Sequence, residues 1–124
     1  MSTTNTTAGQ SPLEMIAADE QTLRRTGKAA RKLLAQHADL PLRGARLKYD
    51  GEIHLKAPTA DDVHVWAERL GTAVIKTTSD PGYGPVSHHT AAEVTLDDIR
   101  VRVWHCRLLY DAEAAAWRES EGRS

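Results

Sequence analysis

The chain has 124 residues, a formal net charge of −1 and a single cysteine, Cys106. This length fits one domain with one core, and the near-neutral charge excludes a strongly basic or acidic protein. One cysteine excludes an internal disulfide and a multi-cysteine zinc framework, which favours a reducing, cytoplasmic location. No apolar run reaches the ~18 residues of a membrane span, so no membrane association is expected. We expect a disordered tail over 1–11, a domain over 12–118 and a frayed end over 119–124.

The first predicted element is a long helix at about 12–37. Ser11, Pro12 and Glu14 form a capping box with proline at the first helical position. Gly27 interrupts the pattern and predicts a kink or a break. The apolar residues that recur on one face of this helix are Leu13, Ile16, Leu23, Ala30 and Leu34.

Residues 45–57 predict a β-hairpin, because apolar and polar residues alternate along them. A two-residue turn would place Leu47 opposite His54 and mix the two faces. A three-residue loop that ends at Gly51 places Leu47 opposite Ile53 and gives the glycine a left-handed conformation. We expect the second register, because it keeps one face apolar.

A second helix is predicted after Thr59, which suits its N-cap, and Gly71 suits the residue that ends it. Residues 72–78 then predict a strand. The apolar face of the helix is formed by Val63, Trp66, Ala67 and Leu70.

A loop rich in proline and glycine, 79–87, precedes a second predicted hairpin with strands at about 88–96 and 99–110. If Leu96 pairs with Ile99, one face is apolar. The expected pairs on the other face are Thr95 with Arg100, Glu93 with Arg102, Ala91 with Trp104, and His89 with Cys106. A short C-terminal helix is predicted from Asp111 through Trp117.

The order α-β-β-α-β-β-β predicts an α+β domain. We expect a two-layer sandwich, in which a mainly antiparallel sheet of about five strands carries two helices on one face. The other face of the sheet is then left open.

Two surfaces are candidates for binding. The first is a basic stripe on the long helix, formed by Arg24, Arg25, Lys28, Arg31 and Lys32. The second is the open side of the sheet, with Arg46, Lys48, His54, Lys56, His89, Arg100, Arg102 and Trp104. Cations around an aromatic ring suit a nucleic acid, whereas an exposed tryptophan equally suits a protein partner or a homodimer. A solvated surface is the alternative for both.

Other chemistry has less support in the sequence. His89, Cys106 and His54 are the only side chains that could gather as metal ligands on the open side, and zinc normally takes three or four. No Gly-rich phosphate loop, nucleophile elbow or catalytic triad is present, so we predict no cofactor and no bound metal. Tyr83, in the Pro/Gly loop, is a further candidate for binding.

Two segments, Ala57–Gly71 and Thr95–Trp104, resemble small uncharacterised proteins of actinobacteria and their phages or mobile elements. The resemblance implies no activity and favours a small accessory or regulatory protein. We therefore expect a non-enzymatic binding protein that acts through its sheet on another protein or on a second copy. The alternatives are a nucleic-acid-binding accessory protein and a small enzyme or metal protein.

Overall fold

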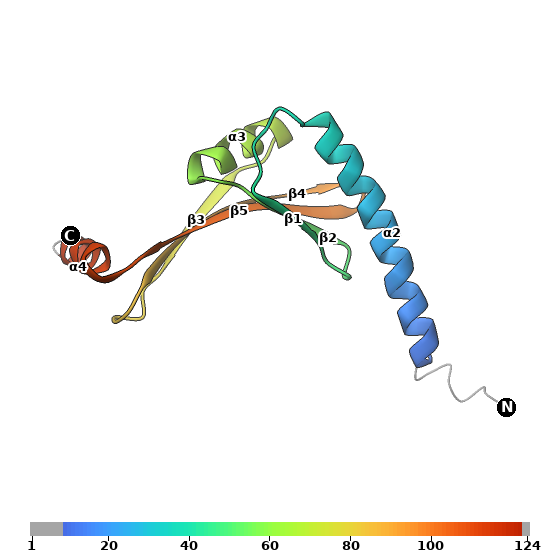
Figure 1. Cartoon of the computed structure of the whole chain (residues 1–124), viewed down its shortest axis with the longest axis horizontal. Coiled ribbons are helices and arrows are strands. Elements are labelled where there is room, and N and C mark those ends of the chain that lie inside the picture. Colours follow the sequence, from blue (N-terminus) through green and yellow to red (C-terminus); the bar gives the residue numbers. More distant parts are fainter. Residues whose placement is uncertain (1–8, 123–124) are drawn as a thin grey trace.

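The computed structural model describes residues 9–122 and consists of a five-stranded sheet with three helices (Figure 1). The order is α-β-β-α-β-β-β-α, so this α+β fold has one helix more than the two in the predicted sandwich. The elements are α2 (Pro12–Gln36), β1 (Gly44–Leu47), β2 (Glu52–Lys56), α3 (Ala60–Leu70), β3 (Val74–Ser79), β4 (Val86–Leu96), β5 (Ile99–Leu109) and α4 (Asp111–Gly122).

The strands lie in the order β1-β2-β5-β4-β3. Three of the four neighbouring pairs are antiparallel, which confirms the predicted mainly antiparallel sheet. The central pair, β2 with β5, is parallel and makes the sheet mixed. This pair joins the two hairpins into one sheet.

Both hairpins adopt the predicted registers. Leu47 lies opposite Ile53, and Gly51 has a φ of +94° in the loop between β1 and β2. Leu96 lies opposite Ile99, so β4 and β5 are joined by a tight two-residue turn. At the centre of the sheet, β2 and β5 therefore present Ile53, Leu55, Val101 and Val103 to one side and Glu52, His54, Arg100 and Arg102 to the other.

The core lies between α3 and the sheet. Thr59 caps α3 by accepting a hydrogen bond from the Asp62 amide, and Gly71 ends it in a left-handed conformation, as predicted. Trp66 is fully buried, and its Nε1 donates to the Pro41 carbonyl at 3.0 Å. The other buried residues of this core include Ile53, Leu55, Val63, Val101 and Val103.

The second half of α2 packs on the same face of the sheet, beside β1 and β2. Its buried residues are Thr26, Ala30 and Leu33. The helix continues without a break through Gly27, where a Cβ atom would lie 3.4 Å from Leu47 Cδ1. The glycine therefore allows close packing on the β1–β2 hairpin and does not interrupt the helix, contrary to the prediction.

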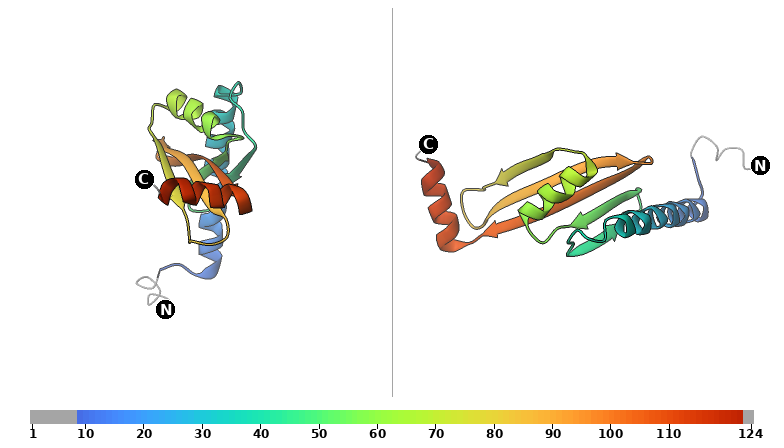
Figure 2. Two further views of the ribbon diagram at one scale, coloured as in Figure 1. Left: turned by 90° about the vertical axis from the view of Figure 1, so that its left-hand side faces the viewer. Right: turned by 90° about the horizontal axis from the view of Figure 1, so that it is seen from above.

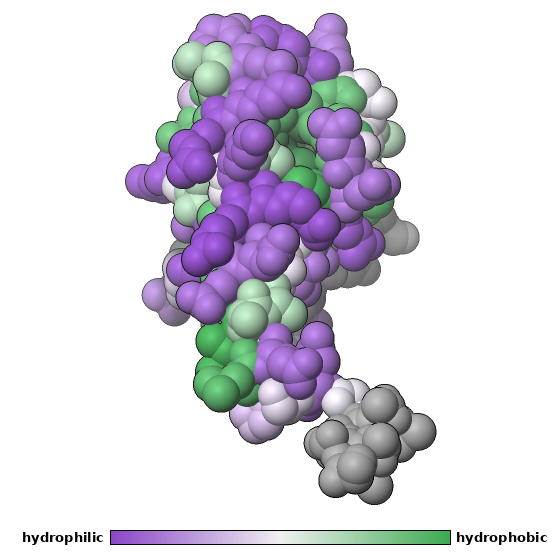
Figure 3. All heavy atoms as spheres, turned by 90° about the vertical axis from the view of Figure 1, so that its right-hand side faces the viewer, coloured by the Kyte–Doolittle hydropathy of each residue, from purple (hydrophilic) through white to green (hydrophobic). Residues whose placement is uncertain are grey.

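The first half of α2 projects past the end of the sheet (Figures 1 and 2). Leu13 is 80% exposed and Ile16 is 57% exposed, so the predicted apolar face is not the packing face at this end. Burial follows the side of the helix that bears Thr26 and Leu33 instead. Figure 3 shows apolar side chains gathered at this end of the molecule, and Leu13, Met15 and Ile16 are the exposed apolar residues there.

The C-terminal helix α4 crosses the far end of β4 and β5 (Figure 2). It packs through Ala114 and Trp117 on Val86 and Leu109. The helix extends to Gly122, beyond the predicted end at Trp117 and into the segment expected to fray. Arg118 accounts for part of this extension, because it pairs with Asp80 at 2.8 Å and donates to the Gly84 carbonyl. None of the described helices has the length and apolarity needed to cross a membrane.

Candidate functional site

The side of the sheet away from α3 is the open face, because no helix among residues 9–122 packs on it (Figure 1). The two registers bring the predicted side chains together there. They are Arg46, Lys48, His54, Lys56, His89, Arg100, Arg102 and Trp104. This placement was predicted from the alternation of polar and apolar residues, and the structure confirms it.

Positive charge predominates on the open face. Five Lys or Arg side chains share it with two carboxylates, Glu52 and Glu93. Arg46, Lys48 and Lys56 form no ion pair within the described part of the chain. Because the whole chain carries a charge of −1, this face is more positive than the protein as a whole.

Trp104 lies half-buried at the centre of the open face. The His89 ring, from β4, stacks parallel to the indole at a centroid distance of 5.8 Å. Lys56, from β2, places its Nζ 5.3 Å from the centroid of the indole ring. The neighbouring strands on both sides therefore hold the indole in place, and a partner meets a preformed aromatic and cationic surface.

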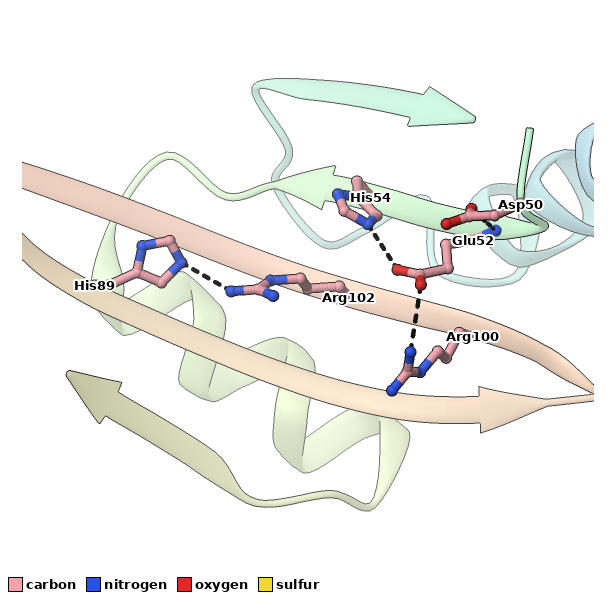
Figure 4. A network of polar contacts seen from close by, with 6 residues as sticks. All are labelled: Asp50, Glu52, His54, His89, Arg100 and Arg102. Atoms are coloured by element: carbon pink, nitrogen blue, oxygen red, sulfur yellow. Dashed lines mark hydrogen bonds and ion pairs between the residues drawn. The ribbon is translucent and has the colours of Figure 1, made fainter. Parts of the chain in front are cut away.

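Glu52 is the main carboxylate in this surface (Figure 4). Its carboxylate accepts hydrogen bonds from His54 Nε2 at 2.9 Å and from Arg100 Nη1 at 3.3 Å. The bond from His54, followed by the charge of Arg100, holds the pKa of the Glu52 carboxyl below its usual 4.5. The charge of Arg100 is therefore partly neutralised, whereas Arg46, Lys48, Lys56 and Arg102 have no carboxylate partner among residues 9–122.

The surroundings of His89 favour its neutral form. Burial, followed by the charges of Arg102 and His105, lowers the pKa of His89 from its usual 6.5. Arg102 Nη2 lies 3.1 Å from His89 Nε2, and because the guanidinium can only donate, this nitrogen of the ring accepts (Figure 4).

This arrangement predicts a pH dependence of folding. Because the pKa of His89 is lower in the folded than in the unfolded chain, the unfolded chain binds more protons as the pH falls below 6.5. We expect the melting temperature to fall between about pH 7.5 and 5.5, and His89→Gln to reduce that fall. His64→Gln, on the exposed side of α3, is the matched control. An equal reduction by both variants would contradict the assignment.

The open face also has an apolar part that the sequence interpretation did not single out. Ile75 and Leu108 are exposed and lie in the same set of register positions as Trp104. The alternation of side chains along β3 and β5 would have been enough to place both residues on this face from the sequence. On the opposite side of Trp104 from Ile75, over β1 and β2, a shallow hollow of about 490 Å³ is lined by Gly44, Ala45, Arg46, Lys48, His54, Lys56 and Trp104.

The basic stripe on α2 is exposed and lies opposite the buried residues Thr26, Ala30 and Leu33. In the part of the chain that the structure describes, Arg24, Arg25, Lys28, Arg31 and Lys32 form no ion pair. The stripe lies on the side of α2 away from the sheet, whereas the open face is the other side of the sheet, so the structure does not join them into one basic surface.

The first ten residues of α2, 12–21, are here called the free half. They contain Glu14, Asp19 and Glu20 and no lysine or arginine. Asp19 and Glu20 are exposed and form no ion pair with any described residue. The free half is therefore an acidic helical segment with exposed apolar side chains.

The remaining candidates lie apart from this surface or lack a complete site. His89 and Cys106 are paired across β4 and β5, but residues 9–122 contain no group of three His, Cys, Asp or Glu side chains arranged to hold a metal ion. Tyr83 is exposed in the β3–β4 loop, which Arg118 ties to α4.

Comparison with known proteins adds no assignment, since no family model, curated protein or solved structure matches this chain.

Proposed function

We propose that this chain is a non-enzymatic binding protein whose open face binds an acidic, amphipathic helix. The segment that fits this description is the free half of α2 in a second copy. The observation that carries the proposal is that one chain exposes two complementary surfaces: a cationic face centred on Trp104, and an acidic helix end with exposed apolar side chains.

The charges of the two surfaces are opposite. The free half carries three carboxylates, at Glu14, Asp19 and Glu20, whereas the open face has an excess of cations. Complementary potentials steer two copies into the correct orientation and penalise wrong pairings. Each exposed charge pair contributes only about 0.2–1 kcal/mol, so charge mainly selects the register of the complex.

Apolar contact supplies the larger part of the binding energy. Leu13 and Ile16 are exposed on the free half, and Trp104, Ile75 and Leu108 are accessible on the open face. A cluster of exposed apolar residues on an unpartnered helix end marks an interaction site. A half-buried tryptophan with cations around it is typical of an interface hot spot.

The dimensions are compatible. The free half is about 15 Å long at 1.5 Å per residue, and five strands spaced about 4.8 Å apart give a sheet about 19 Å wide. Because each copy has one free half and one open face, two copies can exchange these contacts around a two-fold axis. The free half already extends past the sheet toward the open side of the molecule (Figure 1).

The test is sedimentation equilibrium over a range of protein concentrations. We expect a monomer–dimer equilibrium that is weakened about 10-fold or more by Ile16→Glu and about 30-fold by Trp104→Ala. Glu68→Lys changes an exposed charge on α3 and is the control. A protein that stays monomeric at every concentration, with Ile16→Glu indistinguishable from the original chain, would contradict the proposal.

A charge-exchange experiment tests which surfaces meet. Arg46→Glu/Lys56→Glu reverses the open face, and Asp19→Lys/Glu20→Lys reverses the free half. Each variant alone is expected to be monomeric, because its two surfaces have the same sign. Mixed together, they should form a heterodimer, because the reversed open face meets the reversed free half and the two unchanged surfaces meet each other. A mixture that remains monomeric would show that other surfaces carry the association.

Nucleic-acid binding is the second candidate, and the five exposed, unpaired cations of the stripe on α2 favour it. It would appear as binding of single-stranded DNA that weakens steeply with salt and with Arg24→Ala/Arg25→Ala/Lys28→Ala. We rank it second because the His89 ring already stacks on Trp104 and Lys56 lies over the indole, which leaves less of the ring for base stacking.

A further inference from the structure

The helix-bearing face of the sheet contains two apolar clusters with a polar region between them. The larger cluster lies under α3 and α2, and the smaller one, with Val86 and Leu109, lies under α4. Between the N-terminus of α3 and α4 the sheet is uncovered, and a hollow of about 560 Å³ is present there. We call it the polar hollow.

The register explains why this region is polar. One row across the sheet consists of Lys76, Thr90 and His105, and the next consists of Thr78, His88 and Arg107. On either side of these rows the same face carries the buried apolar residues of the two clusters. Four basic side chains from three strands therefore line one hollow, with Asp61 of α3 as the carboxylate in its lining.

The hydrogen bonds inside the hollow leave donor capacity unused. His105 Nδ1 lies 3.4 Å from the Ala57 carbonyl, and His88 Nδ1 lies 3.0 Å from the Thr78 hydroxyl. The Nε2 atom of each ring has no partner among the described residues. Lys76 has no acidic partner there either, and Arg107 uses one guanidinium nitrogen on Glu113 at 2.9 Å.

We propose that the polar hollow binds a small molecule through a phosphate group. Lys76 and Arg107 supply fixed positive charge from β3 and β5, and charge-assisted bonds to phosphate are the strongest hydrogen bonds that such side chains form. The histidines supply further N–H donors that adjust to the ligand. The volume lies within the ordinary range of about 300–1,000 Å³ for small-molecule sites.

This site is independent of the proposed association, since it lies on the opposite face of the sheet from Trp104. Its positive charge comes mainly from side chains on the strands and does not depend on the helix dipole alone. The N-terminus of α3 lies at its rim and adds a favourable dipole. Asp61 opposes binding at the same rim, so a phosphate is expected to lie nearer to Lys76 and His105 than to α3.

The experiment is an NMR titration of ¹⁵N-labelled full-length chain with inorganic phosphate and with pyrophosphate, at constant ionic strength set by sodium chloride. We expect saturable shifts confined to residues near Lys76, His88 and His105, with pyrophosphate binding more tightly than phosphate. Lys76→Met should weaken binding at least fivefold, because it removes one fixed charge and keeps the aliphatic stem. His105→Gln, which keeps a donor but not the imidazole, should weaken it less.

Arg43→Met is the matched control, because it removes one exposed cation beside β1, at the edge of the sheet opposite β3 and outside both proposed binding surfaces. Its affinity for pyrophosphate should equal that of the original chain. Unsaturable shifts spread over both faces, or equal losses in Lys76→Met and Arg43→Met, would overturn the proposal. Both side chains are exposed, so neither variant is expected to perturb folding.

Discussion

Replacing Trp66 with alanine is expected to lower the free energy of unfolding by about 3–5 kcal/mol, a large share of the ~5–15 kcal/mol typical of a domain. The indole is fully buried between α3 and the sheet, so its removal leaves a cavity that the surrounding strands cannot fill. It also removes the hydrogen bond from Nε1 to the Pro41 carbonyl, which ties α3 to the segment between α2 and β1.

Two further variants separate packing from hydrogen bonding. Trp66→Phe keeps most of the ring volume and leaves the Pro41 carbonyl without its donor, so the expected cost is about 1–3 kcal/mol. Trp104→Ala removes an equally large ring that is only half-buried, and it should cost less than Trp66→Ala. Urea unfolding followed by circular dichroism gives the three values. A cost for Trp66→Ala no larger than that for Trp104→Ala would refute the assignment of Trp66 as the central core residue.

The features that the sequence predicted well are determined by neighbouring residues. The capping box of Ser11 and Glu14 is present, and Gly71 ends α3 in a left-handed conformation. The hairpin registers follow from Gly51 and from the rule that one face of a strand must be apolar. The helix caps and the hairpin registers each depend on a few residues close together in the chain, so the properties of those residues are enough to predict them.

The features that it missed depend on contacts between distant segments. No local pattern indicates that β2 and β5 lie side by side and parallel, since their pairing closes a loop of more than 40 residues. Likewise, Arg118 extends α4 through a partner in the β3–β4 loop, which helix propensity cannot show. Long-range packing decided these features, and a single sequence does not display it.

The candidate site likewise has features that the local sequence predicted and features that depend on contacts between distant segments. The open face and its central Trp104 followed from strand alternation. The pairing of Glu52 with both His54 and Arg100, which removes part of the predicted positive charge, required the parallel contact between β2 and β5. The polar hollow was missed because its basic residues come from three strands whose order in the sheet was unknown.

The second large expected effect on the free energy of unfolding comes from the side of α2 that packs on the sheet. Leu33 is buried beside the sheet, so Leu33→Ala is expected to cost about 2–5 kcal/mol. Leu13 belongs to the apolar pattern predicted from the sequence, yet it is 80% exposed, so Leu13→Ala should change the free energy of unfolding by less than about 0.5 kcal/mol. A leucine-to-alanine substitution in this helix is thus expected to lower stability strongly at position 33 and hardly at all at position 13.

Concentration separates the role of Leu13 in folding from its role in binding. Unfolding measured in dilute monomer should be unaffected by Leu13→Ala, whereas the dimer dissociation constant should rise, because association adds stability only to chains that are paired. Leu33→Ala, in contrast, should lower the free energy of unfolding of the monomer strongly, and this loss should be present at every protein concentration. If Leu13→Ala destabilised the dilute monomer as much as Leu33→Ala, the free half would be packed on its own sheet. It could then not serve as the segment that a second copy binds.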